Sequence, residues 1–236
     1  MINLLSDKLA IAMASAATEP QVKTRDAERS RRAILRAAEA LFAERGFDAA
    51  SLAEIGERAG VSRGTPSYFF GSKEELYIAV LEQMSADRTA RLEPAFRPLV
   101  EWAEAKPPNR VPLRAVLSGA VGAYLEFLRE RPAFVDIIER EALDGGGRLA
   151  ELEVESTVME DAFGALRRRA RAHGLRSFDP TEAVICLIAL GYLPVAHRKT
   201  ILHRNGLSLD DPAFARRRRR HIVDLLMLVI GEPDSA

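Results

Sequence analysis

The segment SRGTPSYFF, residues 62–70, places several hydrogen-bonding side chains between two predicted helix starts. These side chains are Ser62, Arg63, Thr65, Ser67 and Tyr68. An arginine can form two hydrogen bonds to a guanine edge or pair with a phosphate, and hydroxyl groups can bond to phosphate oxygens. Ser72 and Lys73 then begin another helix, where backbone amides and an ammonium group can hold a phosphate. The residue types therefore predict contacts with a nucleic acid.

The elements around this segment predict a helix-turn-helix. Ser51 and Glu54 have the spacing of a capping box, so a short helix is expected to begin there. Gly60 ends that helix, and Ser62 is placed to cap the next one. Two short helices joined by a tight turn expose the N-terminal residues of the second helix, which can enter the major groove of DNA.

Two longer helices are predicted on either side of this motif. The first runs from Arg25 to Gly46, because its apolar residues recur with the period of an amphipathic helix. Ser72 and Glu75 form a second capping box, which begins the other long helix. Residues 1–23 are expected to form a flexible tail. The apolar stripe of the first helix consists of Ile34, Leu35, Ala38, Leu41 and Phe42.

Residues 31–81 resemble the tetracycline-repressor (TetR) family of transcriptional regulators. The resemblance is carried by RRAILRAAEALFAERGFDAASLAEIGERAGVSRGTPSYFFGSKEELYIAVL. It implies an all-α fold of about nine helices, a homodimer on a palindromic DNA operator, and release from DNA by a small molecule. Carried over by position, the DNA contacts would be Ser51, Arg63, Gly64, Thr65, Tyr68 and Lys73.

Two positions depart from the family's pattern. Pro66 stands where the family usually has a bulky aliphatic residue, and Ser67 stands where it often has a tyrosine. Proline lacks an amide hydrogen and clashes with the carbonyl four residues earlier, so it fits only the first turn of a helix. The second helix of the motif is therefore expected to begin late or to be partly 3₁₀, and a tyrosine contact is not carried over to Ser67.

Composition sets limits on the other classes of function. Lys and Arg number 34 among 236 residues and Asp and Glu also number 34, so any basic surface must be local. The single cysteine, Cys186, excludes an internal disulfide and a multi-cysteine zinc site, and it is predicted to be buried and inert. No apolar run is long enough to span a membrane, and a cytoplasmic protein is expected. No catalytic arrangement, metal cluster or cofactor loop is visible, so we predict no enzyme, metal or cofactor.

The rest of the chain is also predicted to be helical. Residues 24–84 are assigned to a DNA-binding domain and residues 85–236 to a domain that binds a ligand and dimerises. Helix starts are indicated at Pro112, Pro132, Pro180 and Pro212. A helix is also expected over 149–172, after a glycine linker at 145–147. Residues 216–220, all arginine, point all round a helix and are interpreted as a solvated segment rather than as a second DNA patch.

A ligand cavity is predicted among aromatic and aliphatic residues of the second domain. Glu141 continues an apolar helical stripe and could line this cavity, or its carboxylate could reach solvent or pair with an arginine. The cavity should favour a largely apolar ligand. Its candidate lining is Tyr124, Phe127, Phe134, Ile138, Glu141 and Phe163.

The sequence predicts a homodimer through residues 180–197 and 212–231, since the first of these helices is apolar on every side. We therefore expect a homodimeric repressor that binds a palindromic operator and is released by a small, largely apolar ligand. A regulator of the same fold that activates transcription, or that needs no ligand, is the alternative. A helical enzyme and a pure protein-interaction module remain rivals without support from any motif.

Overall fold

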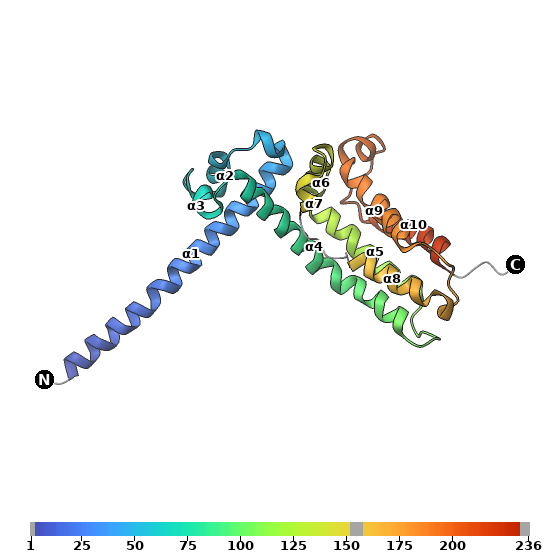
Figure 1. Ribbon diagram of the computed structural model, residues 1–236, viewed down its shortest axis with the longest axis horizontal. Coiled ribbons are helices and arrows are strands. Elements are labelled where there is room, and N and C mark those ends of the chain that lie inside the picture. The colour runs from blue at the N-terminus through green and yellow to red at the C-terminus, as the bar shows by residue number, and fades with distance from the viewer. Residues whose placement is uncertain (1–2, 152–157, 232–236) are drawn as a thin grey trace. The chain divides into compact units, whose positions relative to one another are not determined.

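The computed structural model of the chain describes residues 3–151 and 158–231, and side chains within 25–150 and 158–231. Residues 1–2, 152–157 and 232–236 lie outside this description. The described chain forms α-helices with short 3₁₀ and π turns and contains no strand (Figure 1). The helices are α1 Asn3–Ala49, α2 Leu52–Ala59, α3 Thr65–Phe70, α4 Lys73–Glu104, α5 Leu113–Glu130, α6 Pro132–Leu143, α7 Gly147–Glu151, α8 Val158–Arg169, α9 Pro180–Ala196 and α10 Pro212–Ile230.

The chain divides into two compact units, Met1–Val80 and Leu81–Ala236. The division falls close to the domain boundary expected after residue 84. It lies within α4, so this helix begins in the first unit and continues in the second. Each unit has its own set of buried apolar side chains.

The first unit is built on the predicted apolar stripe of α1, whose five residues are all buried. The backbone at Gly46 has a φ of 83° and is not helical, so the glycine breaks the helix where the sequence predicted. Phe47 then turns back, and its ring lies 5.1 Å from that of Tyr77, with the rings edge to face. This contact joins the end of α1 to the first turns of α4.

The start of α1 differs from the prediction. The helix begins at Asn3 rather than near Arg25, so the segment expected to be a tail is helical from Asn3 onward. Residues 9–17, LAIAMASAA, include five alanines, and alanine has the highest helix propensity of all residues.

The second unit is organised around α9, which contacts α5, α6, α8 and α10 (Figure 1). Asp179 and Asp211 cap α9 and α10 by accepting backbone amide hydrogen bonds, as their position before a proline predicted. The helix expected over 149–172 appears instead as α7 and α8, and its Leu152 lies outside the described residues. Gly145, with a φ of 93°, forms part of the turn before α7.

Candidate nucleic-acid interface and ligand cavity

A close approach of α2 and α3 forms the helix-turn-helix. Gly60 ends α2 in the left-handed conformation, with a φ of 71°. Gly56 is buried where the two helices meet, and a Cβ atom there would lie 2.8 Å from the carbonyl oxygen of Ser62. The amide of Val61 donates to the carbonyl of Gly56 at 3.0 Å. The corner is therefore tight because residue 56 has no side chain.

Pro66 occupies the second position of α3, within the first turn. It is buried with Phe70, one helical turn later, so both face the interior of the unit. The helix begins at Thr65 rather than directly after Ser62, and it is α-helical rather than 3₁₀. The proline is thus accommodated by a late helix start, because the missing amide falls where an intrahelical partner is also missing.

The predicted DNA contacts on α3 and the preceding turn face solvent. Tyr68 is exposed over 85% of its accessible surface. The hydroxyls of Ser62 and Thr65 hydrogen-bond to each other at 2.7 Å. The Arg63 guanidinium is also exposed, and its Nε donates to Glu57 at 2.6 Å. Gly64 and Ser67 are exposed as well, and Thr65 is half-buried.

The remaining two predicted contacts, Ser51 and Lys73, already have partners within the unit. The Ser51 hydroxyl and the Glu54 carboxylate form the capping box of α2, and these hydrogen bonds hold the pKa of Glu54 below its ordinary value. The Lys73 ammonium donates to three backbone carbonyls, those of Phe47 at 2.9 Å, Asp48 at 3.3 Å and Ala50 at 3.2 Å.

These contacts change the interpretation of Lys73. The sequence suggested an ammonium group ready to hold a phosphate, but it donates instead to carbonyl groups at the end of α1 and directly after it. The ammonium also lies 4.3 Å from the centre of the Phe47 ring. The Ser72 amide, likewise predicted to be free, donates to Glu75 at 2.7 Å in the second capping box. A phosphate contact by Lys73 remains a prediction, and it would have to share or replace these bonds.

A cavity of about 230 Å³ lies in the second unit among α4, α5, α6, α8 and α9. Three of the six predicted ligand-binding residues, Tyr124, Phe134 and Ile138, line it. Tyr124 fits against α9 because residue 191 is glycine: a Cβ there would lie 2.4 Å from the Tyr124 ring. The lining residues that the sequence analysis missed are Arg88, Thr89, Leu92, Val158, Met159, Ile188 and Tyr192.

The other three predicted lining residues, Phe127, Glu141 and Phe163, are buried but do not line the cavity. Phe127 is 2% exposed and its ring meets that of Phe134 edge to face at 5.2 Å. Phe163 is completely buried in the core. Glu141 is 1% exposed and pairs with Arg148 at 3.4 Å, which is the alternative that the sequence left open. A helical stripe marks residues as buried but does not say whether they face a neighbour or an empty space.

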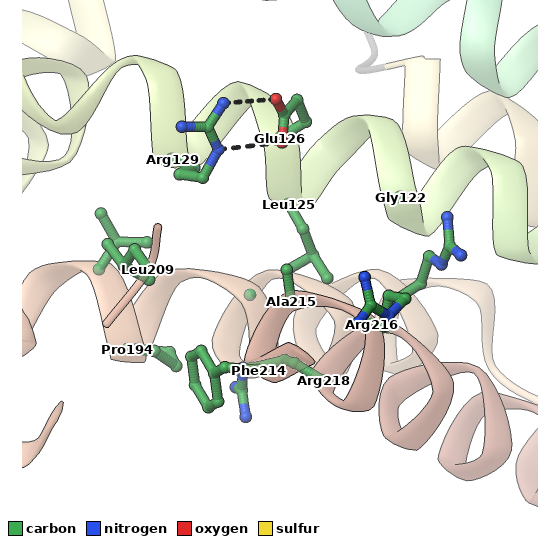
Figure 2. Close-up of a pocket in the computed structure, with 13 residues that line it drawn as sticks. Gly122, Leu125, Glu126, Arg129, Pro194, Leu209, Phe214, Ala215, Arg216 and Arg218 are labelled. Carbon is green, nitrogen blue, oxygen red and sulfur yellow. Dashed lines mark hydrogen bonds and ion pairs between the residues drawn. The ribbon is translucent and has the colours of Figure 1, made fainter. Parts of the chain in front are cut away.

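A second, smaller pocket of about 160 Å³ lies between α5, α9 and α10 (Figure 2). Its wall includes Leu125, Pro194 and Phe214. Four arginines contribute to its lining: Arg129, Arg216, Arg218 and Arg219. Arg129 pairs with Glu126, as Figure 2 shows, and also with Asp210.

The arginine run 216–220 lies on α10, where four of its five residues are exposed, as expected of a solvated segment. Arg218 is half-buried and donates to the carbonyl of Leu190. The prediction for Cys186 was wrong, because its side chain is exposed on α9. The buried face of α9 passes through Val184 and Leu187, and residue 186 lies off that face.

The helices predicted to form the dimer interface expose apolar side chains. On α9, Ile185 is 52% exposed and Leu193 is 51% exposed, and on α10 Leu228 is 67% exposed. Ile185 and Leu193 are two turns apart and share a face of α9. Apolar groups clustered on two adjacent helices are typical of a surface that another protein covers.

The described residues contain no group of three His, Cys, Asp or Glu side chains that could hold a metal ion. Among the helices of the described chain, none combines the length and the apolar character needed to cross a bilayer.

Comparison with known proteins connects both units to one family. Residues 34–80 match the model for bacterial regulatory proteins of the tetR family, and residues 112–226 match that of the tetracyclin repressor-like C-terminal domain. The transcriptional activator FasR of Mycolicibacterium smegmatis is 30% identical over 158 residues, which are 66% of this chain and 66% of FasR. The transcriptional repressor NicS of Pseudomonas putida is 29% identical over 198 residues, which are 80% of this chain and 87% of NicS.

Solved structures share the fold. A TetR-family regulator structure from Mesorhizobium loti superposes with a TM-score of 0.60 at 20% identity, covering 87% of this chain and 98% of that one. The ketosteroid transcriptional regulator KstR2 of Mycobacterium tuberculosis superposes with a TM-score of 0.57, also at 20% identity, covering 86% of this chain and 95% of KstR2. The family models and these relatives describe transcriptional regulators rather than enzymes. The chain belongs to the TetR family of DNA-binding transcriptional regulators.

Proposed function

We propose that this protein is a homodimeric repressor that binds a palindromic operator and leaves it when a small, largely apolar ligand occupies the cavity lined by Tyr124, Phe134 and Ile138. The observation that carries the DNA-binding part is the exposed set of hydrogen-bonding groups on a short helix held by a tight corner. Arg63, Thr65 and Tyr68 are available there to base edges and phosphates.

Arg63 is the residue proposed to read sequence. Its ion pair with Glu57 is exposed to solvent, and such pairs contribute little to stability. DNA can therefore draw the guanidinium away from Glu57 at low cost, while the paired state holds the side chain beside the recognition helix. Tyr68 and the hydroxyls of Ser62 and Ser67 are proposed to contact the DNA backbone.

A dimer is proposed because α9 and α10 expose Ile185, Leu193 and Leu228 to water. Two helices from each of two subunits would form a four-helix bundle that buries these side chains. A palindromic operator would follow from the twofold symmetry of such a dimer, with one recognition helix for each half-site.

Coupling between ligand and DNA is proposed to pass through α4. This helix begins at Lys73, directly after the recognition helix and its turn, and further along it contributes Arg88 and Leu92 to the cavity. In a dimer the two recognition helices must be separated by about one turn of DNA, roughly 34 Å. A ligand that shifts α4 would change this separation, and a coupling of about 1–3 kcal/mol would lower operator affinity about 5–150-fold.

The test uses DNA fragments that the purified protein selects from a random library. Binding to the selected operator should weaken steeply with salt, because the protein releases counterions from DNA phosphates. Arg63→Ala should cost roughly 1–3 kcal/mol on the operator and little on random DNA. Equal losses on both DNAs would show that Arg63 does not read sequence. Failure to select any sequence would contradict the proposed operator.

An activator is the second candidate, because the relative FasR is named an activator. Transcription in vitro from a promoter that carries the selected operator separates the two. A repressor lowers the transcript when it is added, and an activator raises it.

A further inference from the structure

Arg88 is the only charged side chain among the described residues that line the cavity at Tyr124. It lies on α4 at the four-residue spacing of Met84, Leu92 and Phe96, all of which are buried. Residues four apart lie on one face of a helix, so Arg88 lies on the same face of α4 as these buried residues. The side chain is itself half-buried.

The Arg88 guanidinium differs from other arginines around it. Arg91 pairs with Glu130, Arg97 pairs with Glu93, and Arg131 pairs with Asp87. Within the described residues, Arg88 makes no hydrogen bond and no salt bridge.

Burial lowers the pKa of the Arg88 guanidinium, and the exposed carboxylate of Glu160 acts in the opposite direction. An arginine stays charged even so, since its ordinary pKa lies above 12. A half-buried cation without a hydrogen-bonding partner carries an unfavourable desolvation free energy. An anion that pairs with the guanidinium would therefore bind favourably.

The Tyr124 hydroxyl provides a second polar group in the same cavity. Tyr124 is 4% exposed, and burial raises the pKa of its hydroxyl well above the ordinary value, so the group stays protonated and can donate. The described residues give it no hydrogen-bond partner. Tyr192 differs, because its hydroxyl already donates to the carbonyl of Val135 at 3.0 Å.

The rest of the lining is mainly apolar, with Leu92, Phe134, Ile138, Val158, Met159 and Ile188. We propose that the cavity takes an apolar molecule with a single carboxylate, which pairs with the Arg88 guanidinium and accepts a hydrogen bond from the Tyr124 hydroxyl. A planar guanidinium matches a carboxylate with two parallel hydrogen bonds. A cationic ligand would be repelled by Arg88, and a neutral one could not form charge-assisted hydrogen bonds with the guanidinium. This inference rests on the proposed function, which makes the cavity the ligand site.

The test compares three probes with one eight-carbon chain and different head groups: octanoate, octan-1-ol and octylammonium. Binding is measured by titration calorimetry on the full chain. Octanoate should bind roughly 10- to 100-fold more tightly than octan-1-ol, because the carboxylate forms charge-assisted hydrogen bonds. Octylammonium should bind most weakly. Arg88→Met should remove the preference for octanoate, and Arg88→Lys should retain part of it.

Arg91→Met is the matched control, because Arg91 lies on the same helix and pairs with an exposed carboxylate. It should keep the wild-type preference. Equal binding of octanoate and octan-1-ol by the wild type would overturn the carboxylate inference and leave the cavity as an apolar ligand site. A preference for octanoate that survives in Arg88→Met would overturn the role of Arg88. If none of the three probes binds, both the carboxylate inference and the assignment of the cavity as the ligand site are wrong. Operator binding, measured without ligand, tests the proposed DNA-binding function separately.

Discussion

In the first unit, the capping boxes join Ser51 to Glu54 and Ser72 to Glu75, each pair three residues apart. In the second unit, Arg198 reaches Asp136 on α6 with two hydrogen bonds, across 62 positions of sequence. The capping boxes next to the DNA-binding helix are thus closed by partners within one helical turn. The ligand-binding unit has local caps as well, at Asp179 and Asp211, but ion pairs such as Arg198 with Asp136 depend on how distant helices pack.

Lys73 has distant partners although it belongs to the first unit, because its hydrogen bonds connect the start of α4 with the end of α1. Gly56 and Gly191 play similar packing roles in the two units. Each makes room for a close approach, to backbone in the first unit and to the Tyr124 ring in the second. The two units can therefore be perturbed separately, and the following variants test how independent they are.

The largest effect is expected from a charge on the exposed face of α9. Ile185→Lys should leave the monomer folded, because Ile185 is 52% exposed, and should prevent dimer formation. Operator affinity should fall by about 100-fold or more, since two linked half-sites gain that much over one. Sedimentation and operator titration measure both effects.

Val111→Lys is the control for this charge, because Val111 is 50% exposed and lies outside α9 and α10. It should remain dimeric. A fully dimeric Ile185→Lys protein would place the interface elsewhere. Leu187 would be a poor choice for the same test, since it is completely buried and a charge there would unfold the monomer.

The two glycines should separate the functions of the units. Gly56→Ala places a Cβ 2.8 Å from a carbonyl oxygen that cannot rotate away, so the corner must open and the recognition helix must shift. We expect a loss of about 1–3 kcal/mol in stability and a marked loss of operator binding, with probe binding in the cavity retained. Gly191→Ala should have the reverse pattern, because it displaces the Tyr124 ring. Loss of both activities in either variant would show that the units do not behave independently.

Lys73→Met tests whether the ammonium stabilises the fold or contacts DNA. Loss of the hydrogen bonds to three carbonyls should lower the unfolding free energy by about 1–2 kcal/mol without DNA present. A purely DNA-contacting lysine would leave thermal unfolding unchanged and reduce the salt slope of DNA binding by about one unit. If both quantities change, the ammonium has both roles.

The smallest effect is expected from Ser51→Ala, which removes one capping box and should cost about 1 kcal/mol. The pKa of Glu54 is lowered in the folded state, first by the Ser51 hydroxyl and then by Arg45. Such a group stabilises the fold above its ordinary pKa of 4.5, and this contribution is lost as the pH falls through the lowered value. The difference in thermal stability between wild type and Ser51→Ala should therefore shrink below about pH 4.5. A constant difference down to pH 3 would argue against the carboxylate's part in the cap.

The sequence by itself determined the all-α class, the helix starts at residues 51, 72, 179 and 211, and the helix-turn-helix, since each depends on neighbours within a few residues. It also identified the apolar character of α9. These features follow from hydrogen bonds and periodicities that operate along one short stretch of chain.

Tertiary structure alone decided which buried side chains border an empty space. Phe127 and Phe134 both belong to apolar helical stripes, yet Phe134 lines the cavity and Phe127 does not. It likewise decided that Cys186 faces outward and that Lys73 caps α1. The sequence could have identified Arg88 as a single charge in an apolar helical stripe. Its lack of a hydrogen-bonding partner is seen only once the neighbouring helices are in place. The physical reason is that burial and pairing depend on groups brought together from distant parts of the chain, whereas a cap or a helical period is complete within a few residues.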